Sequence, residues 1–300
     1  MPEHESTTEI DERPVTLTTD DGVALSGQWS TPRGQAAPSM AVIVACGAGI
    51  PARFYSRLAR HVAARGAAIL TFDYRGIGAS RRGSLRRLSS GMDDWAVRDL
   101  GAAIAEARRS HSNVPLGAIA HSVGAMLLGA ATGADAIARS VFLGAHTGYW
   151  RDYNARWRLP LFVVWHALMP AVTHAVGYFP GSTFRLGEDL PRGVALDWAR
   201  RRRPALIRTA RDEARFGPYV ERYAAFRAAT LSISISDDAF APPAAAERLL
   251  AMYPALDARR ETVTPGDAGV HKLGHFGFIR RPAGEYFWNR SADWLLLASA

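Results

Sequence analysis

Cysteine is almost absent from this sequence of 300 residues. Cys46 is the single one, so no disulfide can form within the chain. This excludes the disulfide scaffold of a small secreted protein, and a lone cysteine after an apolar run is expected to be a buried hydrophobic residue. The N-terminal residues are acidic and lack the basic start and apolar core of a secretory signal. We therefore expect a cytoplasmic location.

Lysine is also scarce, since Lys272 is the single lysine among 36 basic residues. The basic residues outnumber 28 acidic residues, which gives a formal net charge of +8. They are scattered along the sequence rather than gathered beside aromatic residues, as a nucleic-acid interface would require. We therefore expect solvated arginine side chains and no nucleic-acid partner.

The pattern of apolar residues predicts an α/β fold. Residues 14–19 and 23–30 flank the turn Asp20-Asp21-Gly22, which is typical of a β-hairpin. Further short apolar runs have the length of strands buried on both faces: residues 41–45, 67–72, 116–120 and 141–145. Stretches with helical spacing separate these runs, and such alternation predicts a mostly parallel sheet with helices on both faces.

Residues 147–229 break this alternation with tryptophans, prolines and long segments that carry arginine. The alternation resumes with the strand-like run Leu231–Ser236. We therefore predict one domain over residues 1–300, with a helical cap, or lid, at 147–229 between the core segments 1–146 and 230–300.

The predicted cap contains a charge-free stretch between Arg158 and Arg185 that is long enough to cross a bilayer. Three prolines and two histidines interrupt this stretch. A single crossing would also place the two core segments on opposite sides of the membrane. No transmembrane segment is therefore expected, and the sequence gives no indication of an oligomeric state.

Ser122 lies in a context typical of a nucleophile elbow. The segment Pro115–Ala125 is an apolar run followed by Ser122 and then by a helix-compatible run. A strand-to-helix turn this sharp requires small residues two positions on either side of the serine, hence the pattern G-x-S-x-G. Here Ala120 and Gly124 occupy these positions, so we expect a tight but intact turn.

A serine nucleophile needs a base, and the base needs an acid that orients it. In folds with a nucleophile elbow of this kind, the chain order of the three residues is serine, acid and histidine. Asp237 and Asp238 directly follow a predicted strand, and either is a candidate for the acid. His275 lies between Gly274 and Gly277 just before the last predicted helix and is the candidate base.

A glycine-rich loop, Cys46-Gly47-Ala48-Gly49, follows the apolar run at 41–45. Its backbone amides can face a developing oxyanion together with the amide of Val123, the residue after the serine. The loop therefore supplies a fourth part of the expected site.

Two other histidines have simpler interpretations. His121 precedes the serine on the predicted strand, and neighbours on a strand point to opposite faces, so His121 is expected to pack away from the site. His271 and His275 are four residues apart, but a metal pair at this spacing needs a helix and a third ligand. Gly274 and Gly277 favour a loop here, and no metal site is expected.

These motifs together resemble the α/β-hydrolase superfamily, and in particular bacterial hydrolases similar to serine aminopeptidases and monoacylglycerol lipases. The resemblance covers nearly the whole chain and includes the segments Arg53-Phe54-Tyr55 and Phe72–Ser80. The sequence differs at Ala120, where glycine is usual, and at Cys46, where many relatives have the histidine of a His-Gly pair. Neither difference removes a reacting group.

The resemblance implies the α/β-hydrolase fold with an inserted cap. It also implies a catalytic triad of Ser122, His275 and Asp238. Asp238 is favoured over Asp237 because it stands four residues before Pro242, as the acid does in the family.

The resemblance further implies that the amides of Ala48 and Val123 form the oxyanion hole. It assigns Asp73 to a motif that orders a loop rather than to the triad. No cofactor is required by these groups.

The sequence thus predicts a serine hydrolase that cleaves a small-molecule carboxylic ester through an acyl-enzyme. Apolar runs at residues 161–165 and 167–169 of the predicted cap favour an apolar acyl group, with Phe162 and Trp165 lining the pocket. An acyltransferase or a thioesterase would use the same residues. A catalytically silent binding module on this fold is the alternative outside enzymes.

Overall fold

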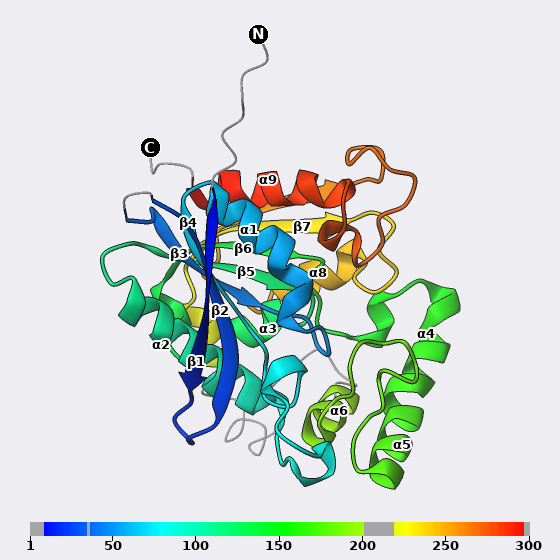
Figure 1. Cartoon of the computed structure of the whole chain (residues 1–300). Helices are drawn as coiled ribbons and strands as arrows, with labels where there is room; N and C mark the ends of the chain where they lie inside the picture. The colour runs from blue at the N-terminus through cyan, green and yellow to red at the C-terminus, as the bar shows by residue number, and fades with distance from the viewer. Residues whose placement is uncertain (1–8, 35–36, 201–218, 297–300) are drawn as a thin grey trace.

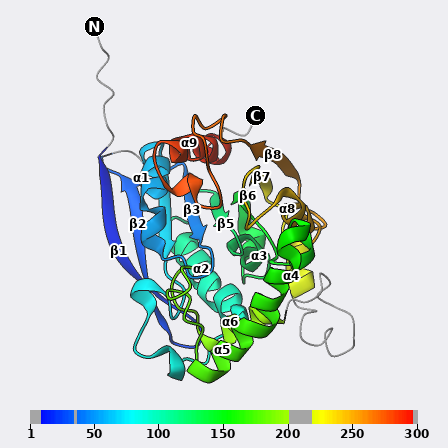
Figure 2. The same cartoon turned by 90° about the vertical axis from the view of Figure 1, so that its right-hand side faces the viewer.

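A computed structural model describes residues 9–34, 37–200 and 219–296. An eight-stranded sheet in the order β1-β2-β4-β3-β5-β6-β7-β8 forms its centre, with helices on both faces (Figures 1 and 2). The strands are β1 (Ile10–Thr18), β2 (Ala24–Pro32), β3 (Met40–Ala45), β4 (Ala67–Phe72), β5 (Leu116–His121), β6 (Ile137–Leu143), β7 (Ala229–Ile235) and β8 (Ala258–Val263). All neighbours from β4 to β8 pair in parallel, so the predicted fold class is confirmed.

The first two strands form the predicted antiparallel hairpin around the turn Asp20-Asp21-Gly22. Gly22 has a φ of 81°, a conformation that glycine adopts without a steric penalty. β2 also pairs antiparallel with β4, which joins the hairpin to the parallel part of the sheet.

Strands β3, β4 and β5 are buried along their whole length, because helices cover both faces of the sheet. Two helices pack against each other on one face, α1 (Ser56–Ala64) and α9 (Ala283–Leu296). Three helices cover the other face, α2 (Gly101–Ser110), α3 (Gly124–Gly129) and α8 (Pro243–Leu250). Right-handed crossovers between parallel strands produce this division.

The sequence prediction for β6 is wrong at both ends. β6 ends at Leu143 rather than at Ala145 and starts at Ile137 rather than at Val141. Gly144 follows the strand with a left-handed φ of 52°, which an extended strand does not contain. Gly144 and the residues after it therefore form a loop.

An insertion, residues 144–228, lies between β6 and β7. One continuous helix comprises α4 (Ala155–Val163), the π-helical segment η7 (Val164–Leu168) and α5 (Met169–Val176), and a second helix is α6 (Arg192–Ala199). Both views place these helices beside one end of the sheet (Figures 1 and 2). Residues 201–218 of the predicted cap lie outside the described residues.

The continuous helix Ala155–Val176 has 22 residues and a mean hydropathy of 1.5 in its most apolar window, 22% of which is buried. By length and composition alone, this helix could cross a membrane. However, β6 precedes the helix, β7 follows it, and these two strands pair side by side in the sheet. The fold therefore joins the chain segments that a single crossing would separate.

Candidate active site

Ser122 lies in the sharp turn between β5 and α3. β5 ends at His121 and α3 begins at Gly124, so the chain changes from strand to helix within two residues. Ser122 has a φ of 58°, which residues other than glycine rarely adopt. Its amide donates a hydrogen bond to the carbonyl of Leu143, which fixes the turn against the end of β6. Backbone strain of this kind is concentrated at functional sites.

The two small residues beside Ser122 differ in how much space they have. Ala120 is fully buried in β5, and the sheet accommodates its methyl group. At Gly124, a methyl group would lie 2.3 Å from the carbonyl oxygen of Ala45 and 2.7 Å from that of Cys46. The start of α3 therefore packs directly on the backbone at the end of β3, and only glycine fits there.

We expect Gly124→Ala to destabilise the protein by about 3 kcal/mol, because the added methyl group meets rigid backbone rather than a flexible side chain. Urea unfolding of the purified variant measures this. Gly266→Ala is the matched control, since a methyl group there would come no closer than 3.7 Å to its nearest neighbour, Thr264 Oγ1. Equal unfolding midpoints for the two variants would show that the contact at Gly124 has no energetic importance.

The structure brings Ser122, His275 and Asp238 together from three distant parts of the chain. The Nε2 atom of His275 lies 3.1 Å from Ser122 Oγ, and its Nδ1 atom lies 2.7 Å from Asp238 Oδ2. All three side chains are buried. Both imidazole nitrogens of His275 therefore have hydrogen-bond partners, one a hydroxyl group and the other a carboxylate.

The second oxygen of Asp238, Oδ1, accepts hydrogen bonds from the amides of Phe240 and Ala241, at 2.7 and 2.9 Å. Burial by itself would raise the pKa of the Asp238 carboxyl, but the hydrogen bond and charge of His275 and these two amides outweigh it and lower the pKa. Asp238 is therefore ionised and can only accept hydrogen bonds. The hydrogen-bond network thus assigns the proton to Nδ1 of His275 and leaves Nε2 as an acceptor.

The neighbouring Asp237 has a different set of contacts. Its carboxylate accepts hydrogen bonds from the amides of Leu273 and Gly274, at 3.0 and 2.9 Å. These amides belong to the loop that carries His275. Asp237 thus holds this loop, whereas Asp238 contacts the imidazole itself.

The glycine-rich loop after β3 lies directly beside the serine. A methyl group at Gly47 would lie 3.4 Å from Ser122 Cβ, so the two backbones are close. The Gly47 amide donates to the Tyr55 hydroxyl group at 2.9 Å, which orients the loop. Within the described part of the chain, neither the Ala48 amide nor the Val123 amide donates a hydrogen bond to protein. Both amides are thus available to a ligand.

The insertion contacts this same loop. The Glu188 amide donates to the carbonyl of Gly49 at 2.7 Å, and the Glu188 carboxylate accepts from the amide of Gly78 at 2.8 Å. Gly49 has a φ of 69°, and a side chain there would meet the backbone of Glu188. The segment around Glu188 therefore fixes the glycine-rich loop from the outside.

His121 is buried, as expected, but it does not point away from the site. Its ring lies 4.7 Å from the ring of His275, between centroids. The prediction was wrong because Ser122 leaves the strand with a left-handed φ, so strand alternation does not hold at the turn. The Tyr55 hydroxyl group lies 2.8 Å from His121 Nδ1. Burial, followed by the neighbouring His275 and His146, keeps the pKa of His121 well below its ordinary value, so His121 is neutral.

A further histidine that sequence reasoning missed lies at the serine. The Nε2 atom of His146 is 2.9 Å from Ser122 Oγ, and the residue is 3% exposed. His146 follows β6, which is the neighbour of β5 in the sheet. The carboxyl ends of adjacent parallel strands meet at one edge of a sheet, so a polar residue just after the run 141–145 was the available signal.

The two predicted pocket residues pack within the insertion. Trp165 is buried against Tyr153 and Trp198, with ring centroids 5.2 and 5.8 Å apart. Trp198 in turn contacts His146, so two aromatic side chains separate Trp165 from Ser122.

Phe162 packs elsewhere, against Trp150 and His166. Trp165 is therefore connected to Ser122 through a series of ring contacts, and the contacts of Phe162 lead into the insertion instead. The sequence provided no basis for separating these two residues.

Cys46 and Asp73 have contacts outside the group of Ser122, His275 and Asp238. Cys46 is fully buried, and burial raises the pKa of its thiol well above the ordinary value, which disfavours the reactive thiolate. The carboxylate of Asp73 accepts hydrogen bonds from the amides of Ala52 and Ala79, at 2.6 and 2.8 Å, and so joins two loops.

Within residues 9–34, 37–200 and 219–296, no group of three or more His, Cys, Asp or Glu residues is placed to hold a metal ion.

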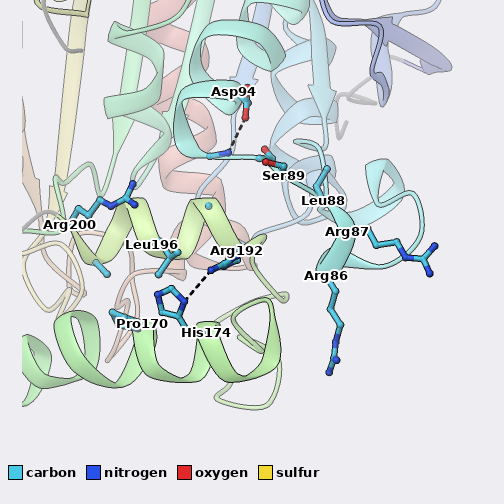
Figure 3. Close-up of a pocket in the computed structure, with 14 residues that line it drawn as sticks. Arg86, Arg87, Leu88, Ser89, Asp94, Pro170, His174, Arg192, Leu196 and Arg200 are labelled. Atoms are coloured by element: carbon cyan, nitrogen blue, oxygen red, sulfur yellow. Dashed lines mark hydrogen bonds between the residues drawn. The ribbon is translucent and has the colours of Figure 1, made fainter. Parts of the chain in front are cut away.

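A cavity of about 820 Å³ lies between residues 86–94 and helices α5 and α6 (Figure 3). Its lining includes Arg192 and His174, whose side chains form a 3.2 Å hydrogen bond. The side chains of Arg86 and Arg87 extend away from that pair in Figure 3. Ser122, Asp238 and His275 do not line this cavity, so it is separate from the candidate active site.

The sheet order, the strained serine and its buried hydrogen-bonded histidine define an α/β-hydrolase. The chain belongs to the family described as "Serine aminopeptidase, S33", which it matches over residues 36–273. It is therefore a hydrolase by family. Among curated proteins, no match was found.

Several solved structures have the same fold. The esterase Pf2001 from Pyrococcus furiosus is 16% identical with a TM-score of 0.61, over 95% of this chain and 91% of that chain. Rv0554 from Mycobacterium tuberculosis is 17% identical with a TM-score of 0.60, over 95% and 100%. A thermophilic esterase from Thermogutta terrifontis is 16% identical with a TM-score of 0.57, over 94% and 98%. At this level of identity, these similarities establish the fold alone.

Proposed function

We propose that the protein hydrolyses carboxylic esters, with Ser122 as nucleophile, His275 as general base and Asp238 as the residue that orients the base. The observation that carries this proposal is the buried series of hydrogen bonds from Ser122 Oγ through His275 to Asp238 Oδ2. The esterases from Pyrococcus furiosus and Thermogutta terrifontis have the same fold and are consistent with it.

In the first half of the reaction, the Ser122 oxygen attacks the acyl carbon while its proton passes to Nε2 of His275. Asp238 stabilises the imidazolium that forms. The negative charge on the carbonyl oxygen is stabilised by the amides of Ala48 and Val123, which have no other acceptor in the described part of the chain. His275 then protonates the departing alcohol, which leaves an acyl-enzyme on Ser122.

In the second half, water takes the place of the alcohol. His275 accepts a proton from water as the water oxygen attacks the acyl carbon. The bond between the acyl carbon and Ser122 Oγ then breaks, and the proton returns from His275 to Oγ. The acid is released, and the enzyme is restored.

Labelling with a fluorophosphonate probe tests the chemistry, because this reagent reacts with an activated serine and does not require a natural substrate. One equivalent of label on the wild-type protein is the expected result. A catalytically silent binding module would remain unlabelled under the same conditions.

The proposed substrate has an apolar acyl group, and the insertion is the proposed cap over the site. The insertion carries the connected rings of Trp165 and Trp198, and the second of these contacts His146 beside Ser122. Tyr153 of the insertion also donates a hydrogen bond to the carbonyl of Phe240, two residues after Asp238. An aromatic wall so close to the serine favours apolar acyl chains over charged or peptide substrates.

We expect kcat/KM for p-nitrophenyl esters to rise by up to about fourfold per methylene from acetyl towards hexanoyl, because each buried methylene contributes roughly 0.8 kcal/mol. Trp165→Ala should flatten this rise, since it removes support from the aromatic wall. Phe162→Ala is the matched control and should leave the slope unchanged, because Phe162 packs on Trp150 and His166. A rise that Trp165→Ala leaves untouched would make the insertion a structural cover only.

A further inference from the structure

The hydroxyl oxygen of Ser122 has two imidazole neighbours rather than one. His275 Nε2 lies 3.1 Å away and His146 Nε2 lies 2.9 Å away. The two rings approach each other edge to face, with centroids 5.7 Å apart. The mechanism described above uses His275 and leaves the role of His146 open.

The protons on Ser122 and His275 determine whether His146 donates or accepts a hydrogen bond at the serine. The Asp238 carboxylate is ionised, so His275 carries its proton on Nδ1 and its Nε2 accepts the hydroxyl proton of Ser122. A serine hydroxyl group has one proton to donate. The short contact with His146 is therefore a hydrogen bond only if His146 Nε2 carries a proton and donates it to a lone pair of Ser122 Oγ.

The position of His146 is fixed by its surroundings. Gly144 and Gly148 stand two residues before and after it with left-handed φ values of 52° and 74°. The ring of Trp198 packs edge to face on the His146 ring, with centroids 5.9 Å apart, and a methyl group at Gly148 would lie 2.9 Å from that tryptophan. His146 is thus held between α6 and the serine, with its ring buried.

We propose that His146 is a second catalytic histidine, which donates a hydrogen bond to Ser122 Oγ and assists release of the acyl group from the acyl-enzyme. This inference rests on the proposed function. During deacylation, the bond between the acyl carbon and Ser122 Oγ breaks, the electron pair goes to Oγ, and the proton on His275 Nε2 transfers to Oγ. The N–H group of His146 stabilises the negative charge that Oγ gains in this step and keeps its own proton.

Acylation has the opposite charge movement at the same atom. Electron density leaves Ser122 Oγ as it attacks the acyl carbon, so a donated hydrogen bond gives no assistance there. His146 is therefore expected to affect the two halves of the reaction unequally, and a residue that only fills space would not.

The test compares both steps in His146→Phe, which keeps an aromatic ring and removes the N–H group. Stopped-flow measurements with p-nitrophenyl butyrate should show a burst of about one equivalent and a deacylation rate lowered roughly 10- to 100-fold. The rate of fluorophosphonate labelling, which reports attack by Ser122 alone, should change less than about threefold. A wild-type deacylation rate, or an equal loss in both rates, would overturn the proposal.

His146→Gln and His146→Met provide a second comparison if the phenylalanine variant does not fold. The two side chains have similar length, but glutamine can donate a hydrogen bond and methionine cannot. Deacylation should be faster in the glutamine variant, and equal deacylation rates would overturn the proposal. If the wild-type protein is neither labelled nor active on esters, the proposed function fails instead, so the two failures are distinguishable.

Discussion

Ser122→Ala is expected to abolish fluorophosphonate labelling and to lower ester turnover by about a million-fold, as loss of a triad nucleophile does in well-studied serine enzymes. The variant should fold, because alanine is no larger than serine and loses only the hydroxyl group. The hydrogen bond from the amide of residue 122 to Leu143 does not involve the side chain and should persist. Turnover of p-nitrophenyl butyrate, together with the thermal unfolding temperature, measures both parts of this expectation.

A second buried serine provides the control. Ser291 is fully buried in α9, and its hydroxyl group donates to the carbonyl of Phe287. Ser291→Ala should therefore cost about 1 kcal/mol of stability and leave ester turnover unchanged. If Ser122→Ala keeps a tenth of wild-type turnover, Ser122 is not the nucleophile.

The fold could be predicted from the sequence because short apolar runs and turn residues act locally. The hairpin at Asp20-Asp21-Gly22 and the runs at residues 41–45 and 67–72 match strands of the sheet closely. β6 was misplaced because Ala145 is apolar like a strand residue, while Gly144 adopts a left-handed φ that composition does not reveal. Backbone conformation at one glycine thus decided where that strand ends.

The residues of the site likewise differ in whether the sequence alone indicates them. Ser122 and His275 have local signals. Ser122 lies between the small residues Ala120 and Gly124 at a turn from strand to helix, and His275 follows Gly274 in a loop before the last helix. The sequence marks His146 only as a polar residue just after the apolar run 141–145, and His146 reaches Ser122 because β5 and β6 are adjacent in the sheet. His121 contacts His275 because β5 ends at His121 and Ser122 leaves the strand with a left-handed φ, so the alternation of side chains along the strand does not hold there. Contacts of this kind require the assembled sheet.

The second largest loss of activity is expected for a substitution of the acid residue, Asp238. Asp238→Asn should lower kcat/KM by about 10⁴-fold, which is typical when a triad histidine is held in the wrong tautomer. In this variant, neighbouring backbone groups would hold the new side-chain amide with its NH₂ group towards His275. The amides of Phe240 and Ala241 both donate to Oδ1 and would keep an acceptor oxygen there. The NH₂ group would then face His275 Nδ1, move the ring proton to Nε2 and prevent His275 from accepting the Ser122 proton.

Asp237→Asn is the matched comparison, and it should lower kcat/KM by less than about tenfold. Asp237 accepts one amide on each oxygen, from Leu273 and Gly274, so asparagine retains one of these two hydrogen bonds. Asp237 is exposed, and water can accept from the amide that loses its partner. Steady-state kinetics of both variants on one p-nitrophenyl ester measures the ranking. A larger loss in Asp237→Asn than in Asp238→Asn would mean that positioning the loop of His275 matters more than the tautomer of its ring.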